Sequence, residues 1–265
     1  MKTIGGAASA IVIGLLGTSL TGAAPAAYAP TGCGAKPTVV LVHGAWAGTS
    51  SWSGEVSRLQ GKGYPARAVA NPLRGLTGDA ASVSGFLKSV HGPVVLVGHS
   101  YGGAVITNAA AGNANVKALV YVDAAAPAVG ETTGGLSGAG SALGADPATL
   151  FDKVGTDLYL KQAVFTRSFG PDLAPGDADL LWASQRPAAM AAFTTPSAAA
   201  AWRNIPSWYV IGGSDKIITP ASQESMAHRA NAKIRTVPGG SHLTLISHPD
   251  AVTDQILAAA QRACG

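Results

Sequence analysis

The sequence predicts a single α/β domain built on a doubly wound, mostly parallel sheet of six strands. Short apolar runs alternate along the chain with longer segments in which apolar residues recur at helical spacing. The two strongest runs, residues 38–42 and 93–97, are almost entirely apolar, which is typical of parallel strands buried on both faces. Because the connections between runs are short, we expect right-handed crossovers with helices on both faces of the sheet.

Six runs account for the predicted strands, and a helix lies between most neighbours. The strands are expected at residues 38–42, 66–70, 93–97, 117–122, 207–211 and 233–237. Helical spacing of Trp52, Val56 and Leu59 predicts the first helix, which ends near the glycines at 61 and 63. Further helices are expected near residues 83–90, 103–111, after Pro220, and from Pro249 to about residue 263.

The segment between the fourth and fifth strands is the exception to this alternation. Residues from about 125 to 205 contain many Gly, Ala and Pro, no strong strand, and short helix-like pieces around Leu158, Leu180 and Ala200. An insertion of this length without its own apparent core is expected to form a helical cap over the sheet. The chain is therefore interpreted as one domain, residues 30–265, with a cap insertion.

The first 29 residues have the pattern of a secretory signal peptide. A positive start is followed by an apolar, acid-free stretch from Ile4 to Leu20 and by a small-x-small site that ends at Ala29. The alternative is a retained membrane anchor, but the apolar run is short and is interrupted by Gly14 and Gly17. We expect cleavage after Ala29, a secreted protein, and no stable membrane anchoring afterwards.

Charge and cysteine content bear on the expected binding partners and on a possible disulfide. The chain has 18 Lys and Arg against 14 Asp and Glu, a formal charge of +4 with no basic cluster, so nucleic acid is not an expected partner. The two cysteines, Cys33 and Cys264, lie near opposite ends of the mature chain. In an exported protein such a pair favours a disulfide, with two unrelated thiols as the alternative.

The chemistry is carried by Gly98-His99-Ser100-Tyr101-Gly102-Gly103, which follows the strand at 93–97. Gly-x-Ser-x-Gly between a strand and a helix is a nucleophile elbow: the chain turns so sharply that Ser100 projects from the sheet. Side chains at positions 98 and 102 are expected to collide with neighbouring backbone, which accounts for both glycines.

A serine nucleophile needs a base that is itself oriented by an acid. His242 follows the last strand in a glycine-rich loop and is the expected base, and Asp215 follows the strand at 207–211 and is the expected acid. Asp123, after the strand at 117–122, is the rival acid and could instead cap the loop into the insertion. If His242 is the base, activity should fall in acid as its imidazole becomes protonated.

The remaining candidates surround this centre. The backbone N–H groups of Tyr101 and Ala45 are the expected donors to a developing oxyanion. Trp46, Trp182 and Leu243 are candidate residues of the substrate pocket, with ordinary packing as the alternative for the cap residues.

With HGAW at 43–46, GHSYGG at 98–103, GGSD at 212–215 and GGSH at 239–242, the chain resembles the α/β-hydrolase superfamily over nearly its whole mature length. More narrowly it is similar to the small esterases that include plant methylesterases, hydroxynitrile lyases and bacterial pyrethroid-type carboxylesterases. The related lyases carry threonine where this chain has Gly44 and lysine where it has Leu243, and the absence of both favours hydrolysis. The resemblance implies no cofactor, and the sequence contains no evident metal-binding cluster.

The predicted function is therefore a secreted serine carboxylesterase acting on a small-molecule ester. An acyltransferase, perhydrolase or C–C hydrolase using the same residues is the first alternative, and a ligand-binding protein on a hydrolase fold is the second. The natural substrate, the acyl-chain length, any motion of the cap and the oligomeric state stay open.

Overall fold

In a computed structural model of the chain, residues 1–2, 5 and 35–263 are described. The main sheet has six strands in the order β2-β1-β3-β4-β8-β9, and every neighbouring pair is parallel. The strands are β1 Thr38–Val42, β2 Ala66–Val69, β3 Val94–His99, β4 Val116–Val122, β8 Ser207–Gly212 and β9 Lys233–Val237. The predicted α/β class and the six-stranded parallel sheet are confirmed.

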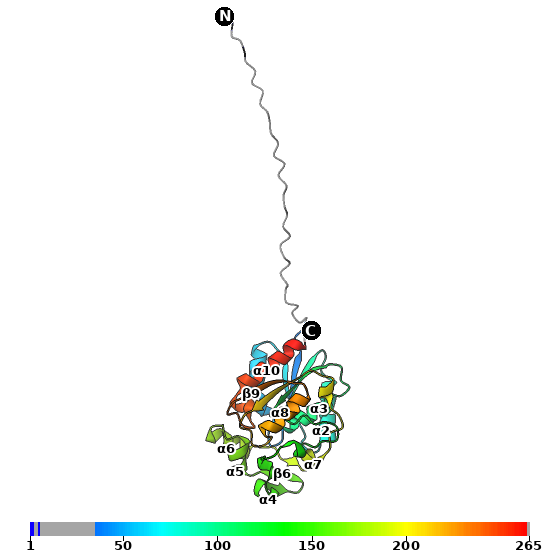
Figure 1. The fold of residues 1–265 in the computed structure, drawn as a ribbon, viewed down its shortest axis with the longest axis vertical. Helices are drawn as coiled ribbons and strands as arrows, with labels where there is room; N and C mark the ends of the chain where they lie inside the picture. The colour runs from blue at the N-terminus through cyan, green and yellow to red at the C-terminus, as the bar shows by residue number, and fades with distance from the viewer. Residues whose placement is uncertain (3–4, 6–34, 264–265) are drawn as a thin grey trace. The chain divides into compact units, whose positions relative to one another are not determined.

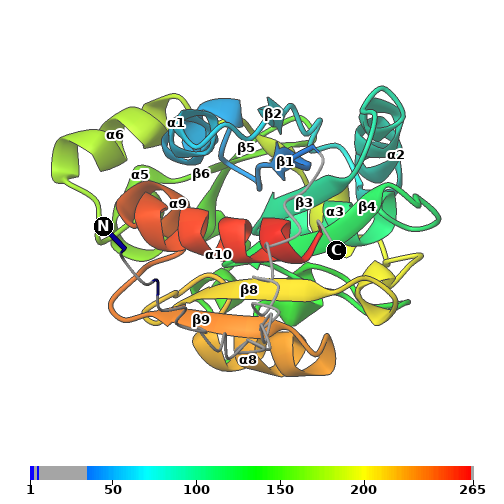
Figure 2. The same ribbon diagram turned by 90° about the horizontal axis from the view of Figure 1, so that it is seen from above.

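Helices cover both faces of this sheet (Figures 1 and 2). On one face α1 (Ser53–Gly61) packs against α10 (Pro249–Arg262), which also contacts β3, β4 and β8. On the other face α3 (Tyr101–Ala109) lies against β1, β3 and β4 and packs on α2 (Leu76–Leu87). α8 (Pro220–Arg229) covers β8 and β9, and a 3₁₀ turn at Thr49–Trp52 and the short helix α9 (Thr244–Ser247) complete the main layers.

The central strands place the site at one edge of the sheet. β3, β4 and β8 are buried almost throughout, as their apolar sequences predict. Because all the strands run in one direction, the loops that follow β1, β3, β4, β8 and β9 emerge at the same edge. Ligand sites of open parallel sheets lie at this carboxyl edge.

The segment between β4 and β8 contains short elements of both kinds. Besides helical turns it forms a small antiparallel sheet, which the sequence did not predict. Leu158 lies in the central strand of this small sheet, so the prediction of a helical piece around that residue was wrong. Successive residues of 157–160 alternate between partly buried and buried, with Leu158 and Leu160 on the buried face, as in a half-buried strand. The elements are η2 Gly134–Leu136, η3 Ala142–Gly144, α4 Pro147–Leu150, β5 Phe151–Val154, β6 Asp157–Leu160, α5 Gln162–Val164, the π-helical turn η4 Phe165–Phe169, α6 Pro175–Ala183, β7 Ala188–Ala189, α7 Ala191–Thr194 and η5 Ala201–Arg203.

The expected signal peptide and the expected disulfide between Cys33 and Cys264 lie outside the described residues. Within the described part of the chain, none of the helices has both the length and the apolar content needed to span a bilayer.

Candidate active site

Ser100 lies in the sharp turn between β3 and α3. Its backbone has φ 53° and ψ −126°, a conformation that costs energy for any residue with a side chain. A Cβ at Gly98 would lie 2.5 Å from the carbonyl oxygen of Gly102, and a Cβ at Gly102 would lie 2.5 Å from the carbonyl oxygen of Val42. The expected steric reason for both glycines is therefore present in the structure.

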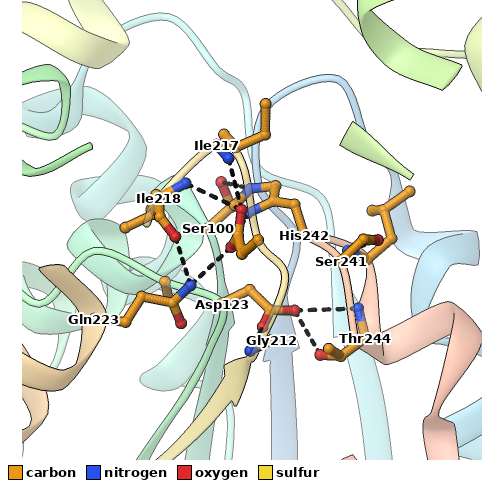
Figure 3. A network of polar contacts seen from close by, with 12 residues as sticks. Ser100, Asp123, Gly212, Ile217, Ile218, Gln223, Ser241, His242 and Thr244 are labelled. Atoms are coloured by element: carbon orange, nitrogen blue, oxygen red, sulfur yellow. Dashed lines mark hydrogen bonds and ion pairs between the residues drawn. The ribbon is translucent and has the colours of Figure 1, made fainter. Parts of the chain in front are cut away.

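A continuous chain of hydrogen bonds joins Ser100, His242 and Asp215 (Figure 3). The Ser100 hydroxyl donates to His242 Nε2 over 2.7 Å, and His242 Nδ1–H donates to Asp215 Oδ2 over 2.7 Å. These residues follow β3, β9 and β8, respectively. An imidazole in this position can take the hydroxyl proton while the carboxylate fixes its orientation.

The carboxyl group of Asp215 is surrounded by donors. Oδ1 accepts from the backbone N–H groups of Ile217 and Ile218 at 2.7 and 3.1 Å, and Oδ2 accepts from Gln223 Nε2 at 2.7 Å. Burial raises the pKa of Asp215 above its usual value, while these three donors act in the opposite direction. The sequence does not indicate the role of Gln223, because nothing in the spacing of an α8 glutamine reveals its partner.

Asp123, the rival acid, is placed differently. Its Oδ1 accepts from the backbone N–H of Gly212 at 2.8 Å, and its Oδ2 accepts from the backbone N–H of Thr244 at 3.1 Å and from the Thr244 hydroxyl. Figure 3 shows Asp123 below His242, with dashed lines to Thr244. Asp123 therefore joins the end of β8 to the segment after His242. Burial, followed by the nearby charge of Asp215, raises the pKa of Asp123 well above its usual value.

The histidines of the site are buried and electrically neutral at ordinary pH. Burial lowers the pKa of His242 from 6.5 to about 3, so its imidazole is free to accept a proton. His99 is also fully buried, and its Nε2 lies 2.8 Å from the backbone carbonyl oxygen of His242. Burial, assisted by the neighbouring His242, lowers the pKa of His99 as well.

The two proposed oxyanion donors belong to segments that the structure holds firmly. Tyr101 begins α3, where the first N–H groups of a helix have no partner within the helix. Its hydroxyl donates to Asp79 Oδ2 over 2.6 Å. Ala45 is 1% exposed and lies in the turn after β1, directly before Trp46, whose φ is +56°. A Cβ at Gly44 would lie 2.6 Å from Ser100 Cβ, so this turn passes directly beside the serine.

Aromatic side chains of the insertion pack against Trp46, in the turn after β1, and against the imidazole of His242. The Trp46 indole stacks between Phe151 and Phe193, with ring centroids 5.5 and 5.3 Å away, and its Nε1–H donates to the backbone carbonyl of Leu158 over 2.9 Å. The Phe169 ring lies 4.9 Å from the His242 imidazole in an edge-on arrangement. Ser100 itself is 7% exposed.

The candidate pocket residues are only partly brought together. Trp46 and Leu243 line a common cavity, whereas Trp182 is not among the residues that line it. The Trp182 Nε1–H donates to the backbone carbonyl of Leu160 over 2.9 Å, and the neighbouring Leu181 lines the cavity instead. Trp182 therefore binds the backbone of β6 and does not line this cavity.

Asp172 in the insertion also reaches the histidine loop. It accepts hydrogen bonds from the backbone N–H and the hydroxyl of Ser241. Although burial alone would raise the pKa of Asp172, hydrogen bonds from Ser241 and Ser247 bring it below its usual value. A single sequence carries no signal for this contact, because the two residues are 69 positions apart and lie on irregular segments.

Comparison with known proteins agrees with this fold and its motifs. Residues 39–255 match the model of the alpha/beta hydrolase family, and the chain belongs to that family. It is 32% identical to the alpha/beta hydrolase nvfD of Aspergillus novofumigatus, over 86% of this chain and 98% of that protein. The fold is similar to that of the methylesterase MES16 from Arabidopsis, with a TM-score of 0.68, 21% identity, and coverage of 84% and 98% of the two chains. It is also similar to a pyrethroid hydrolase from Sphingobium faniae, with a TM-score of 0.68, 22% identity, and coverage of 84% and 97%. The family resemblance drawn from the sequence motifs is thus confirmed.

Proposed function

We propose that the protein is a serine carboxylesterase that works through an acyl-enzyme intermediate. The observation that carries this proposal is the hydrogen-bonded chain of Ser100, His242 and Asp215 at a strained strand-to-helix turn. The similarity to proteins described as a methylesterase and a pyrethroid hydrolase supports ester bonds as the substrate class.

In the proposed reaction Ser100 Oγ attacks the ester carbonyl carbon while its proton passes to His242 Nε2. The N–H groups of Ala45 and Tyr101 stabilise the negative charge on the carbonyl oxygen. The carbon–oxygen bond to the alcohol then breaks, and His242 gives its proton to the leaving alcohol. A water molecule, deprotonated by His242, attacks the acyl-enzyme, and the acid is released with Ser100 regenerated. Asp215 orients the imidazole and stabilises its cation in both halves.

Two features of the turn after β1 and of the histidine loop favour hydrolysis over the related lyase reaction. A side chain at Gly44 would collide with Ser100 Cβ, so the threonine of the lyases has no room in this backbone. Leu243 is buried and lines an apolar wall, where the lyases have a lysine. Acyl transfer to an alcohol stays the alternative, and product analysis with water and alcohol in competition separates the two.

The test is hydrolysis of p-nitrophenyl esters, from acetate to palmitate, by the mature protein. Ser100→Ala should abolish turnover, while Ser89→Ala, an exposed serine after α2, should leave it unchanged. The chain length with the highest kcat/KM then measures the acyl pocket. Equal activity of wild type and Ser100→Ala would contradict the proposal. Equal inactivity would favour the hypothesis of a ligand-binding protein on a hydrolase fold.

We also propose that the protein is exported, cleaved after Ala29 and closed by a disulfide between Cys33 and Cys264. The support is the composition of the first 29 residues and the even pair of cysteines. The intact mass of the secreted product tests both parts at once. It should correspond to a chain that begins at Pro30 and is lighter by two hydrogen atoms than the reduced form.

A further inference from the structure

A cavity of about 200 Å³ lies beside the proposed reacting groups. Trp46, which directly follows Ala45, forms one wall, and Leu243, which directly follows His242, forms another. Phe169, whose ring contacts the His242 imidazole, also lines it. The lining of the cavity therefore extends to the immediate neighbours of both the oxyanion donor and the base.

The lining of this cavity also includes polar residues and one positive charge. The polar lining residues are Thr49, Ser50, Ser51, Ser184, Gln185 and Arg186. None of the lining residues is acidic. Arg186 is thus the single formal charge in the lining, and its sign suits an anionic group.

The guanidinium of Arg186 has no acidic partner in the part of the chain that the structure describes. Its Nη1 lies 3.4 Å from Nε2 of His43. Burial, assisted by the charge of Arg186, lowers the pKa of His43 to about 4, so this neighbour is uncharged at neutral pH. By contrast, the guanidinium of Arg74 pairs with Asp157 and that of Arg229 pairs with Glu131.

A second, apolar cavity of about 430 Å³ also reaches Trp46. Phe151, Leu158 and Phe193 line it, together with a glycine-rich segment of the insertion. Phe193 also lies 6.1 Å from the ring of Tyr101, the residue after Ser100. Trp46 therefore borders two cavities, a larger apolar one that also includes Phe193 and a smaller one that includes Arg186 and Leu243.

We propose, on the basis of the esterase function above, that the cavity at Arg186 binds a carboxylate carried by the alcohol part of the ester. The alcohol must leave next to His242, because His242 supplies its proton. Phe169 and Leu243 join that position to the cavity, and Arg186 can meet a carboxylate there with two parallel N–H donors. The apolar cavity beyond Trp46 takes the acyl chain. Arg186 is then a specificity-determining residue, and the substrate class is an apolar acyl ester of a hydroxy acid.

The experiment uses a matched pair of esters, 4-carboxyphenyl butanoate and its uncharged isostere 4-carbamoylphenyl butanoate. Each kcat/KM is divided by the rate of hydroxide hydrolysis of the same ester, which removes the difference in leaving-group reactivity. Wild type should prefer the carboxylate ester by about 10- to 100-fold, through a lower KM. Arg186→Gln should lose this preference because its kcat/KM falls mainly on the carboxylate ester, and Arg186→Lys should retain part of the preference. Arg167→Gln, an exposed arginine of the same insertion, is the matched control and should behave as wild type.

A preference that is absent in wild type, or unchanged in Arg186→Gln, overturns the inference and leaves the esterase function intact. If neither ester is hydrolysed, calorimetric titration of the product 4-hydroxybenzoate decides independently of turnover. Binding to Ser100→Ala that is weakened at least tenfold by adding Arg186→Gln upholds the carboxylate site. Equal binding by the two variants, or no binding to either, overturns it.

Discussion

Asp172 of the inserted segment accepts hydrogen bonds from both the backbone N–H and the hydroxyl of Ser241, the residue directly before His242. The N–Oδ2 distance is 3.1 Å, and the same Ser241 hydroxyl accepts from the N–H of Leu243 at 3.2 Å. Phe169 lies against the imidazole, and a Cβ at Gly170 would lie 2.9 Å from Leu243 Cδ1. The insertion thus contacts the histidine loop at three consecutive residues, 241 to 243. The insertion therefore positions the proposed base as well as covering it.

Removing this contact should slow the reaction more than it weakens substrate binding. We expect Asp172→Ala to lower kcat about tenfold with little change in KM, because small displacements of a catalytic group are costly. Asp172→Asn retains one acceptor oxygen and should recover part of the loss. Asp177→Ala, in the first turn of α6, is the control within the same insertion. A loss of kcat that is equal in Asp172→Ala and Asp177→Ala would mean that the contact has no positioning role.

Mutation of Asp215 and of Asp123, the two buried carboxyl groups of the site, should have different effects. Asp215→Asn should lower kcat by about 10³- to 10⁴-fold, since an amide favours the wrong imidazole tautomer. Asp123→Asn removes an acceptor of Gly212 and Thr244, so it should cost about 1–3 kcal/mol in the free energy of unfolding and leave most of kcat. Denaturant unfolding and steady-state kinetics on both variants check this. A kcat loss of 10³-fold in Asp123→Asn would assign the acid role to Asp123.

The pH dependence of the esterase should reflect the burial of its base. Because burial lowers the pKa of His242, the neutral imidazole persists below the pH at which an exposed histidine becomes charged. We expect kcat/KM to stay constant as the pH falls from 8 through 6.5 and to decline only at lower pH. Circular dichroism at each pH separates protonation of His242 from unfolding. An acid midpoint at or above 6.5 would show that the imidazole is solvated in the free enzyme.

Glu55 should make the folded state less stable as the pH rises. Its carboxyl oxygens are buried and have no hydrogen-bond partner among the described residues, and burial raises its pKa from 4.5 to about 8. The folded protein therefore keeps a proton that the unfolded chain has already released. The free energy of unfolding should fall between pH 4.5 and 8 by at most about 1.4 kcal/mol per pH unit relative to Glu55→Gln.

The matched control for this prediction is Glu224→Gln, an exposed glutamate on α8. Comparing wild type with each variant at the same pH removes the opposite contribution of the buried histidines, which raise the free energy of unfolding as the pH rises to 6.5. If the difference between wild type and Glu55→Gln is independent of pH, the Glu55 carboxyl is ionised in the folded protein.

The sheet could be predicted because each of its strands is a short, local pattern. The apolar runs at 38–42 and 207–211 become β1 and β8 within one residue. The need for glycine at positions 98 and 102 could also be predicted, because the turn at Ser100 leaves no room for a larger residue at either position. The hairpin at residues 151–160 could not be predicted, since strands of four residues in a polar, glycine-containing segment show no distinctive hydrophobic period.

The residues around the proposed catalytic groups are placed by contacts between segments that are distant in the sequence. Ser100, Asp215 and His242 follow recognisable strands, so their approach could be inferred from the parallel sheet. The partners of those residues could not, because Gln223, Asp172 and Phe169 reach the site only through tertiary packing. Arg186 was also missed, since an arginine between a glutamine and a proline does not reveal which cavity it will line.

The distance along the chain between Ser100 and His242 has a consequence for biosynthesis. The serine is in place once β1, β3 and α3 have come together, but its hydrogen-bond partner follows β9, an edge strand, 142 residues later. On the proposed roles, a nascent or truncated chain that ends before β9 contains the nucleophile without the means to activate it. Turnover then reports that synthesis has passed His242, and fragments that end before β9 should be inactive toward esters.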